Sequence, residues 1–324
     1  MAKKTYIKAI TEGIDIALAE DPKTLVFGED VGKNGGVFRA TNGLQEKYGK
    51  DRVFSTPLAE SGILGLSIGL AATGWRPVSE IQFMGFTFEA MDSIAGQMSR
   101  VRFPIGWSKN MPITIRLHTV VVSTAELHGD DLENFFVGIP GLRVVTPSSA
   151  YDAKGLVISA IENNDPVLFL ENLRLYRSVK GEVPDDKYTV PLDKANVVEE
   201  GNDVTIIAYG GEVSEAQKAA KKLAKKNISA EIIDLRSLYP LDTDTIFESI
   251  KKTHRVVIVQ EAQKMAGVGA QVASAISEGA IMYLDAPVIR VAAPNSVYPF
   301  PQAENVWLPG ADDIEDAATQ AVNY

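Results

Sequence analysis

The sequence predicts an α/β protein built from two doubly wound domains. A chain of 324 residues is longer than one ordinary hydrophobic core supports. Short apolar runs of strand length alternate with helical segments in both halves of the chain, which favours mostly parallel sheets. One polar, proline-containing segment, "YRSVKGEVPDDKYTVPLDKANVVEEGND", interrupts this alternation. We therefore expect a first domain over 1–180, a linker over 181–200 and a second domain over 201–324.

The first half of the chain opens with a predicted helix, because Ile7, Ile10, Ile14 and Leu18 recur at helical spacing. Predicted strands follow at "TLVFGED", "PVSEIQF", "PITIRLHTVVV" and "RVVTPS". Predicted helices lie at "GILGLSIGLAATG", "TFEAMDSIAGQMSRVR" and "SAYDAKGLVISAIENN".

The second half repeats the alternation after the linker. Its predicted strands are "VTIIAYG", "SAEIIDLRS", "HRVVIVQEA" and "PVIRVAAP", and its predicted helices are "SEAQKAAKKLAKK" and "GAQVASAISEG". This order predicts a second doubly wound sheet.

Composition excludes several classes of function. Cysteine is absent, so disulfides and thiolate chemistry are excluded and the cytoplasm is the expected compartment. The run "ILGLSIGLAATGW" is shorter than the roughly 20 residues that a membrane span needs. A formal charge of -10 argues against nucleic acid as a partner.

Acidic residues are concentrated near the C-terminus. From Ala266 onward Arg290 is the single basic residue, against Glu278, Asp285, Glu304, Asp312, Asp313, Glu315 and Asp316. This asymmetry fits either a solvated surface or a docking surface for a basic partner.

Common catalytic motifs are missing. The glycine-rich dinucleotide fingerprint, the Walker phosphate loop and the hydrolase nucleophile elbow are absent, and three scattered histidines do not form a zinc site. In "FSTPLAESGILGL", Glu60 lies at a strand-to-helix junction followed by small residues. A carboxylate there either interacts with the helix dipole or faces a flat ligand.

A series of motifs then gives a family resemblance. "FGEDVGKNGGVFRATNGLQEKYGKDRVFSTPLAESG", "EIQFMGFTFEAMDSIAGQM", "YDAKGLVISAIENNDPVLFLE", "AEIIDLRSLYPLDTDTI", "VVIVQEAQ" and "APVIRVAAPNSVYPFPQAE" stand in order. Together they resemble the beta subunits of thiamine-dependent 2-oxo acid dehydrogenases, in particular the pyruvate type of Gram-positive bacteria. The resemblance runs from about residue 5 to the C-terminus.

The resemblance implies a transketolase-like pyrimidine-binding domain followed by a transketolase C-terminal domain. It implies an α2β2 heterotetramer with an alpha subunit, in which pyruvate is oxidatively decarboxylated and a lipoyl group is acetylated. One alternative is a different substrate, either a branched-chain 2-oxo acid or acetoin. The other is a non-catalytic role as an assembly subunit of such a complex. Expected partners are the lipoyl domain and the basic peripheral subunit-binding domain of dihydrolipoyl acyltransferase, the latter docking on the acidic C-terminal region.

Particular residues take roles from this resemblance. Glu60 would hydrogen-bond the aminopyrimidine of thiamine diphosphate, Phe86 would stack on it and Gln82 would line the same pocket. His128, in "ELH", would act as acid or base in reductive acylation of the lipoyl group. The chain lacks the Gly-Asp-Gly motif that binds diphosphate and Mg2+ in relatives, so the alpha partner is expected to hold both.

Two further sites are expected. Glu89 and Asp92 are three residues apart on a predicted helix and would belong either to an acidic passage between two active sites or to polar contacts with a neighbouring subunit. A potassium ion would be bound by a set of backbone and side-chain oxygens, those of Ile113, Ala160, Ile161, Asn163 and Asp165.

The chain departs from the family over residues 104–138. Relatives carry proline and glycines where this sequence has "LHTVVVSTA", so a strand is expected to continue from Arg116 to Val122. His118 and His254 match no functional position and are expected to be structural.

Overall fold

Two α/β units make up the chain. The computed structural model describes residues 2–104, 106, 109–120 and 126–324. The first unit comprises Met1–Val121 and Phe135–Leu192, and the second comprises Val122–Asn134 and Asp193–Tyr324. The range 181–200, expected to be a linker, includes most of one strand and all of another.

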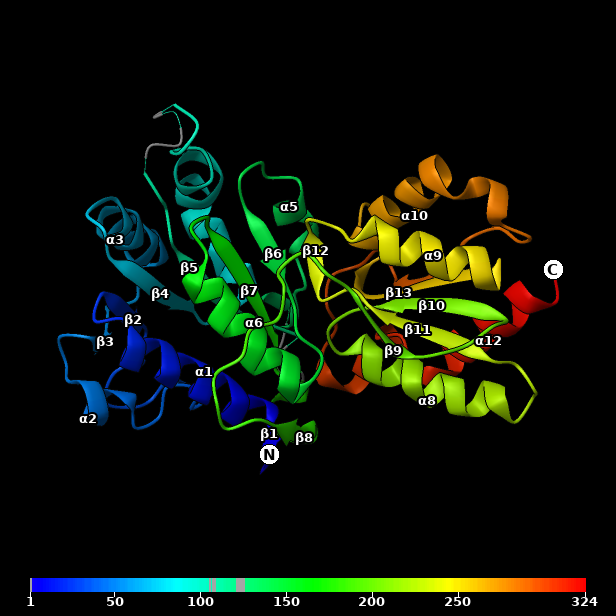
Figure 1. Cartoon of the computed structure of the whole chain (residues 1–324), viewed down its shortest axis with the longest axis horizontal. Coiled ribbons are helices and arrows are strands. Elements are labelled where there is room, and N and C mark those ends of the chain that lie inside the picture. The colour runs from blue at the N-terminus through cyan, green and yellow to red at the C-terminus, as the bar shows by residue number, and fades with distance from the viewer. Residues whose placement is uncertain (1, 105, 107–108, 121–125) are drawn as a thin grey trace. The chain divides into compact units, whose positions relative to one another are not determined.

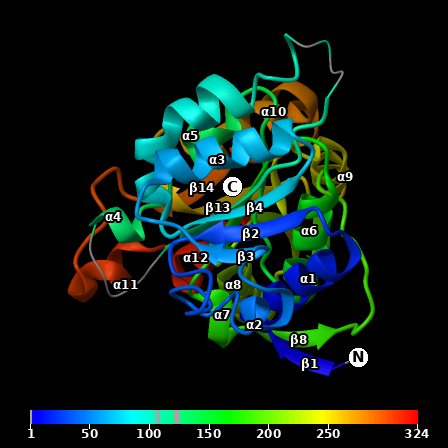
Figure 2. The ribbon, with the colours of Figure 1, turned by 90° about the vertical axis from the view of Figure 1, so that its left-hand side faces the viewer.

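The first unit contains a parallel sheet with strand order β6-β7-β5-β4-β2-β3 (Figure 1). Its strands are β2 (Thr24–Gly28), β3 (Val53–Ser55), β4 (Arg76–Ile81), β5 (Thr114–Thr119), β6 (Arg143–Val145) and β7 (Val167–Asn172). Its helices are α1 (Tyr6–Glu20), α2 (Leu44–Tyr48), α3 (Glu60–Ala72), α6 (Ala150–Glu162) and α7 (Leu175–Ser178), together with most of α5 (Glu133–Val137). In Figure 2, α3 lies on one side of β2 and β4, and α1 and α6 lie on the other.

The second unit contains a sheet with strand order β14-β13-β10-β11-β9, parallel except for β9. Its strands are β9 (Asn196–Glu199), β10 (Val204–Ala208), β11 (Ala230–Asp234), β13 (Val256–Gln263) and β14 (Ile289–Ala293), and β12 (Ser237–Tyr239) follows β11 in the chain. Its helices are α4 (Glu126–Gly129), α8 (Glu212–Ala224), α9 (Thr243–Thr253), α10 (Val268–Gly279), α11 (Glu304–Trp307) and α12 (Ala311–Val322), with short 3₁₀ turns at Ile281–Tyr283 and Pro301–Ala303. The predicted mixed, mainly parallel α/β architecture is confirmed in both units.

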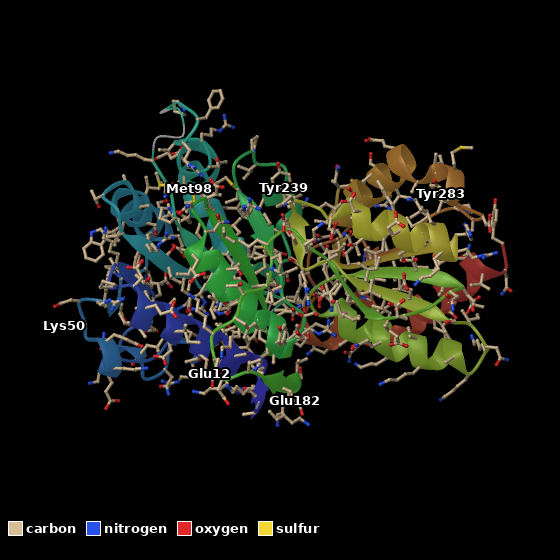
Figure 3. All side chains as sticks on the ribbon, in the orientation of Figure 1. Glu12, Lys50, Met98, Glu182, Tyr239 and Tyr283 are labelled. Atoms are coloured by element: carbon tan, nitrogen blue, oxygen red, sulfur yellow. The ribbon has the colours of Figure 1, made fainter. Side chains whose placement is uncertain are left out.

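A small antiparallel ladder closes the first unit. Strand β1 (Ala2–Thr5) pairs with β8 (Lys180–Val183), and Lys4 donates from Nζ to Glu12 on α1 over 2.6 Å. Figure 3 labels Glu12 on α1 and Glu182 on β8. The ladder therefore ties both ends of this unit's sequence to its first helix.

Two predicted elements differ from the structure. The segment expected as one α-helix over 87–102 is a 3₁₀ helix, η1 (Met84–Ala90), followed by a π-helix, η2 (Asp92–Met98). The strand expected to reach Val122 ends at Thr119, because Val120 has φ of +49°. Residues 121–125 lie outside the described ranges.

Helices α1 and α6 pack closely on the first sheet. The apolar positions Ile10, Ile14 and Leu18 are buried as their spacing predicts, and they contact α6 in one core cluster. Gly13 permits this approach: a Cβ there would lie 2.3 Å from Val157 Cγ1 and 3.2 Å from the Lys154 carbonyl oxygen.

None of the helices in the described ranges combines the length and apolar character that a membrane crossing requires.

Replacing Gly13 by alanine is expected to destabilise the full chain. The added methyl group overpacks the α1–α6 contact at a cost of about 1–3 kcal/mol, which exceeds the helix-propensity gain of about 1 kcal/mol. Urea unfolding monitored by circular dichroism measures the difference. The matched control is Gly65→Ala on α3, where no heavy atom lies within 4 Å of the added Cβ. Equal stability of Gly13→Ala and wild type would contradict the packing argument.

Candidate functional site

The carboxyl ends of β2, β3 and β4 meet at one edge of the first sheet. The parallel register aligns Gly28 with Ser55 on one side and with Glu80 on the other. Glu29 follows β2, and Gln82 follows β4. Ligands of open parallel sheets bind at such edges, so the predicted site residues of this unit lie where the fold favours a ligand.

Glu60 is the first residue of α3 and is half-buried. The N-cap position belongs to Ala59, which provides no side-chain cap. A carboxylate in the first helical turn is stabilised by the helix dipole. The dipole interaction and a ligand-binding role are compatible at this position, because the helix end leaves part of the carboxylate accessible.

Glu29 is a functional candidate that sequence reasoning missed. It is 4% exposed, and neither carboxylate oxygen has a hydrogen-bond partner within the described part of the chain. Burial raises the pKa of Glu29 to about 7, with further contributions from the charges of Glu60, Asp30 and Glu80. A buried carboxyl that titrates near neutral pH beside another carboxylate is typical of proton-transfer sites. The signal in the sequence was only an acid directly after a buried strand.

Gln82 and Phe86 lie on the segment that leaves β4. Both are half-buried, and the ring of Phe86 packs edge-to-face on Phe83 with centroids 5.2 Å apart. Both rings lie on the segment that follows β4, one of the strands whose carboxyl ends form the edge where Glu29 follows β2. The structure thus brings three of the predicted site residues, Glu60, Gln82 and Phe86, to one region of the first unit.

Glu89 and Asp92 do not lie on one α-helix, contrary to the expectation from the sequence. Glu89 lies on the 3₁₀ helix η1, and Asp92 is the first residue of the π-helix η2. Both side chains are exposed in this chain, and Asp92 accepts a hydrogen bond from Gln97 over 2.8 Å. The hydroxyl of Ser61 donates to the Glu89 carbonyl oxygen, which connects this segment to the start of α3.

His128 lies on α4 and belongs to the second unit. It is half-buried. The next residue, Gly129, packs directly on the ring of Tyr298, where a Cβ would lie 2.3 Å from the ring. A glycine is therefore required at position 129 for the segment that carries His128 to pack against the Tyr298 ring.

A buried acidic group follows His128. Glu133 accepts a hydrogen bond from the Tyr209 hydroxyl over 2.5 Å, and Asp131 and Glu261 are also buried. Burial raises the pKa of Asp131 well above its ordinary value, and the charge of Glu133 adds to this effect. Protonated Asp131 can remain in this interior without a counter-cation.

The other two histidines have local partners. His254 ends α9 with φ of +60°, and its Nδ1 lies 2.8 Å from the Tyr283 carbonyl oxygen. His118 is buried on β5 between Gln82 and Tyr176.

The oxygens expected to bind potassium already have partners. Arg76 donates from Nη1 to the carbonyl oxygens of Ile161 and Asn163, each over 3.0 Å, and Arg102 pairs with Asp165. The remaining expected ligands accept backbone hydrogen bonds: Val167 N–H to the Ile113 carbonyl, Asn163 N–H to the Ala160 carbonyl, and Asn164 and Asp165 N–H to the Asn163 side chain. Two guanidinium groups therefore supply positive charge at the end of α6, and a potassium ion at these oxygens would have to displace or share them.

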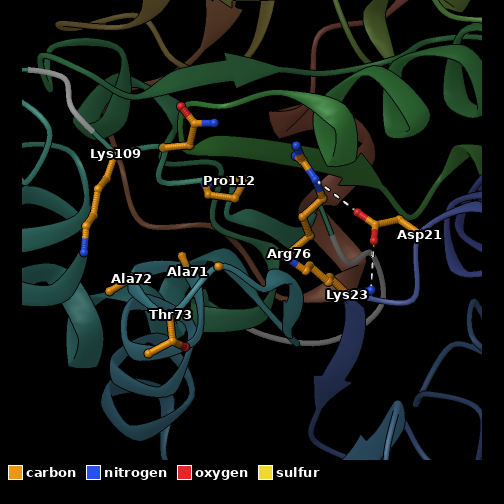
Figure 4. A pocket seen from close by; sticks show the side chains of 10 residues that line it. Asp21, Lys23, Ala71, Ala72, Thr73, Arg76, Lys109 and Pro112 are labelled. Atoms are coloured by element: carbon orange, nitrogen blue, oxygen red, sulfur yellow. Dashed lines mark hydrogen bonds and ion pairs between the residues drawn. The ribbon is translucent and has the colours of Figure 1, made fainter.

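The pocket beside Arg76 is separate from the carboxylate site. It has a volume of about 550 Å³ and is lined by the C-terminal end of α3 and by Asp21, Lys23, Arg76, Lys109, Asn110 and Pro112 (Figure 4). Asp21 forms an ion pair with Arg76, whose Nε lies 3.3 Å from the Asp21 carboxylate. Glu60 lies at the opposite end of α3, about 18 Å away along the helix. Among the described residues, no group of three or more His, Asp or Glu side chains is arranged to bind a metal ion.

The two units match a known pair of domain families. Residues 2–179 match the transketolase pyrimidine-binding domain, and residues 193–314 match the transketolase C-terminal domain. A solved structure described as a split-gene transketolase, inactive beta4 tetramer, superposes with a TM-score of 0.82 at 25% identity, covering 98% of each chain. A transketolase mutant from Pichia stipitis shares the fold, with a TM-score of 0.72 at 14% identity over all of this chain and 47% of that one. The chain is thus a transketolase-like protein.

Curated relatives narrow the class. The pyruvate dehydrogenase E1 component subunit beta of Staphylococcus epidermidis is 54% identical over the full length of both chains. The protein of the same name from Staphylococcus aureus is also 54% identical over the full length of both. The chain belongs to the family of pyruvate dehydrogenase E1 beta subunits, and the predicted resemblance is confirmed.

Replacing Glu29 by glutamine should change how stability depends on pH. The folded pKa of about 7 lies above the ordinary 4.5, so wild type loses stability as pH rises through this window. At about 1.4 kcal/mol per pKa unit, the stability difference between variant and wild type should shift by about 3 kcal/mol toward the variant from pH 4.5 to pH 8. Chemical unfolding of the full chain at several pH values measures it. Glu46→Gln, an exposed control, should show no such trend, and parallel pH curves for Glu29→Gln and wild type would refute the assignment.

Potassium should have no effect on the stability of the chain. Exchange of potassium for tetramethylammonium is expected to leave the thermal midpoint unchanged, because Arg76 and Arg102 already occupy the acceptors. Arg76→Met should lower the free energy of unfolding by about 2 kcal/mol, since two carbonyl groups lose their donors. Lys109→Met, in the same pocket, is the control. A midpoint that rises with potassium would show that the ion does bind.

Proposed function

We propose that the chain is the catalytic beta subunit of a thiamine diphosphate-dependent pyruvate dehydrogenase. Together with an alpha subunit it would decarboxylate pyruvate oxidatively and acetylate the lipoyl group of dihydrolipoyl acyltransferase. Family membership supports the proposal, and so do the names of the relatives. The observation that carries it is the pair of carboxyls, half-buried Glu60 and buried Glu29, at the sheet edge beside Phe86.

Three side chains fit the aminopyrimidine of thiamine diphosphate. Glu60 would hold a proton at a pyrimidine ring nitrogen, Phe86 would cover one face of the ring and Gln82 would line its edge. Glu29, whose pKa is raised to about 7, can take up or release a proton near neutral pH. Bound thiamine diphosphate supplies the electron sink for decarboxylation of a 2-oxo acid.

The diphosphate and Mg2+ are assigned to the alpha subunit in an α2β2 heterotetramer. The exposure of the site supports a site completed by a partner: Glu60 and Phe86 are only half-buried, and Glu89 and Asp92 are exposed. In the assembly these last two carboxylates would either line an acidic passage between two active sites or contact the neighbouring subunit.

His128 is proposed as the acid that protonates a dithiolane sulfur when the lipoyl domain delivers its lipoyl group. The peripheral subunit-binding domain of the acyltransferase would dock on the acidic C-terminal region. Part of that charge is neutralised within the chain, because Lys222 pairs with Asp312 and Lys226 pairs with Glu315 over 2.8 Å. Asp285 also lies 3.9 Å from Arg255 Nη2, and exposed Glu278 and Asp316 remain for a basic partner.

Two alternatives differ in substrate or in class. A branched-chain 2-oxo acid or acetoin would require a recast pocket, and the sequence differences over 104–138 are where such a change would lie. A non-catalytic assembly subunit would not need Glu60, Gln82, Phe86 and His128 together. The curated relatives favour pyruvate.

Replacing Glu60 by glutamine should abolish turnover and leave assembly intact. A neutral amide cannot hold the pyrimidine proton, so the release of carbon dioxide from pyruvate should fall by about 100-fold or more. The measurement uses the chain purified with its alpha subunit, with and without thiamine diphosphate, and a branched-chain 2-oxo acid in parallel. Glu46→Gln is the exposed control. Wild-type turnover by Glu60→Gln would refute the assignment, and wild-type preference for the branched substrate would select the alternative.

A further inference from the structure

His118 is a buried side chain that the proposed mechanism does not use. It lies on β5 and is 1% exposed. Its Nδ1 is 2.8 Å from the carbonyl oxygen of Gln82, and its Nε2 is 2.9 Å from the hydroxyl of Tyr176. The imidazole is therefore held at both nitrogens, once by the segment that leaves β4 and once by α7.

The Gln82 contact fixes which nitrogen carries a proton. A backbone carbonyl oxygen only accepts hydrogen bonds, so the Nδ1 of His118 must be the donor. This hydrogen bond satisfies a carbonyl group immediately before η1, the 3₁₀ helix that carries Phe86. A buried carbonyl without a donor would cost free energy and permit the segment to shift.

The Nε2 side of the His118 imidazole contacts, through Tyr176, a buried network of ion pairs. The Tyr176 hydroxyl contacts Glu171, which accepts from Arg116 Nε over 2.5 Å and from Nη2 over 2.8 Å. Arg116 Nη1 also donates to Glu80 on β4 over 2.5 Å. Burial and the charge of Glu171 raise the pKa of Tyr176 well above its ordinary value, so the hydroxyl keeps its proton.

Aromatic contacts give a second connection from His118 to Phe86. The imidazole lies edge-on to Phe38 at a centroid distance of 4.8 Å, and Phe38 lies edge-on to Phe83 at 5.9 Å. Phe83 in turn packs on Phe86 at 5.2 Å. Rotation of the imidazole would disturb this row of rings as well as the hydrogen bond.

We propose that His118 is a positioning residue for the cofactor-binding segment: its Nδ1–H fixes the Gln82 carbonyl and thereby sets the place of Phe86. The ligand in this inference, the aminopyrimidine of thiamine diphosphate, rests on the function proposed above. The protonated Nδ1 of His118 and its hydrogen bond to the Gln82 carbonyl do not depend on that proposed function.

Two substitutions separate the hydrogen bond from simple space filling. In His118→Asn the amide nitrogen takes the place of Nδ1 and retains a donor, whereas His118→Leu retains bulk without a donor. The dissociation constant of thiamine diphosphate, in the presence of Mg2+, is measured by calorimetry on the assembled alpha–beta complex. The His118→Leu variant should bind thiamine diphosphate about tenfold more weakly than wild type, and His118→Asn less than about threefold more weakly. Equal binding by leucine and wild type, or equally weak binding by both variants, would overturn the proposal.

Thermal unfolding without cofactor provides the structural comparison. A merely structural role would lower the midpoint and the affinity in proportion for both variants. If His118 is a positioning residue, His118→Asn should retain affinity for thiamine diphosphate even where its thermal midpoint stays below that of wild type.

A cofactor-independent measurement tests the hydrogen bond itself. The chain has three histidines, so selective 15N-histidine labelling of the full chain gives few signals, and His118→Asn identifies the one that belongs to His118. We expect a protonated Nδ1, and an unprotonated Nδ1 would overturn the proposal. If the wild-type complex fails to bind thiamine diphosphate, the proposed function fails, and the 15N result still decides the role of His118 in holding Gln82.

Discussion

The buried ion pairs of Arg116 are the interaction on which the first unit depends. The parallel register of β4, β5 and β7 places Arg116 opposite Glu80 on one neighbour and within reach of Glu171 on the other. All three side chains are at most 2% exposed. Removal of one member of such a buried group leaves an uncompensated charge at a cost of about 3–5 kcal/mol. The sheet edge that carries the candidate site is thus held by charge as well as by backbone hydrogen bonds.

This group also shapes the electrostatics of the candidate site. One guanidinium faces two carboxylates, so the group retains net negative charge. Glu80 is therefore among the charges that disfavour ionisation of Glu29, although burial is the larger cause. Glu80, on the strand β4 that neighbours β2, thereby links the buried ion pair of Arg116 to the proton affinity of Glu29. A substitution in the buried Arg116 group would therefore also affect the candidate site of this unit.

The sequence predicted the parts of the structure that depend on local pattern. Most buried strands and the helices α1, α3, α6, α8 and α10 were predicted near their observed places, because apolar periodicity reports burial directly. Helices α9 and α12 were not predicted. Glu60, Gln82 and Phe86 were recognised from motifs, and the structure places them in one region. Glu29 was missed because an acid after a strand is common, and its significance arises from Glu60, 31 positions later. The contacts of Arg76 with the Ile161 and Asn163 carbonyl oxygens were missed for a similar reason, because Arg76 lies far away in sequence. The ending of β5 rests on a positive φ at Val120, a conformation that β-branched residues rarely adopt.

The assignment of residues 122–134 to the second unit has a consequence for dissecting this chain. The polypeptide leaves the first unit, contributes the segment that carries His128 to the second, and returns before the boundary at Leu192. The ring that seats this segment, Tyr298, lies on the far side of that boundary in sequence. A fragment that ends at Leu192 would carry the histidine without its support, and a fragment that begins at Asp193 would leave the Tyr298 ring uncovered. Neither unit is therefore one continuous stretch of the sequence, and a single genetic cut cannot yield both of them whole.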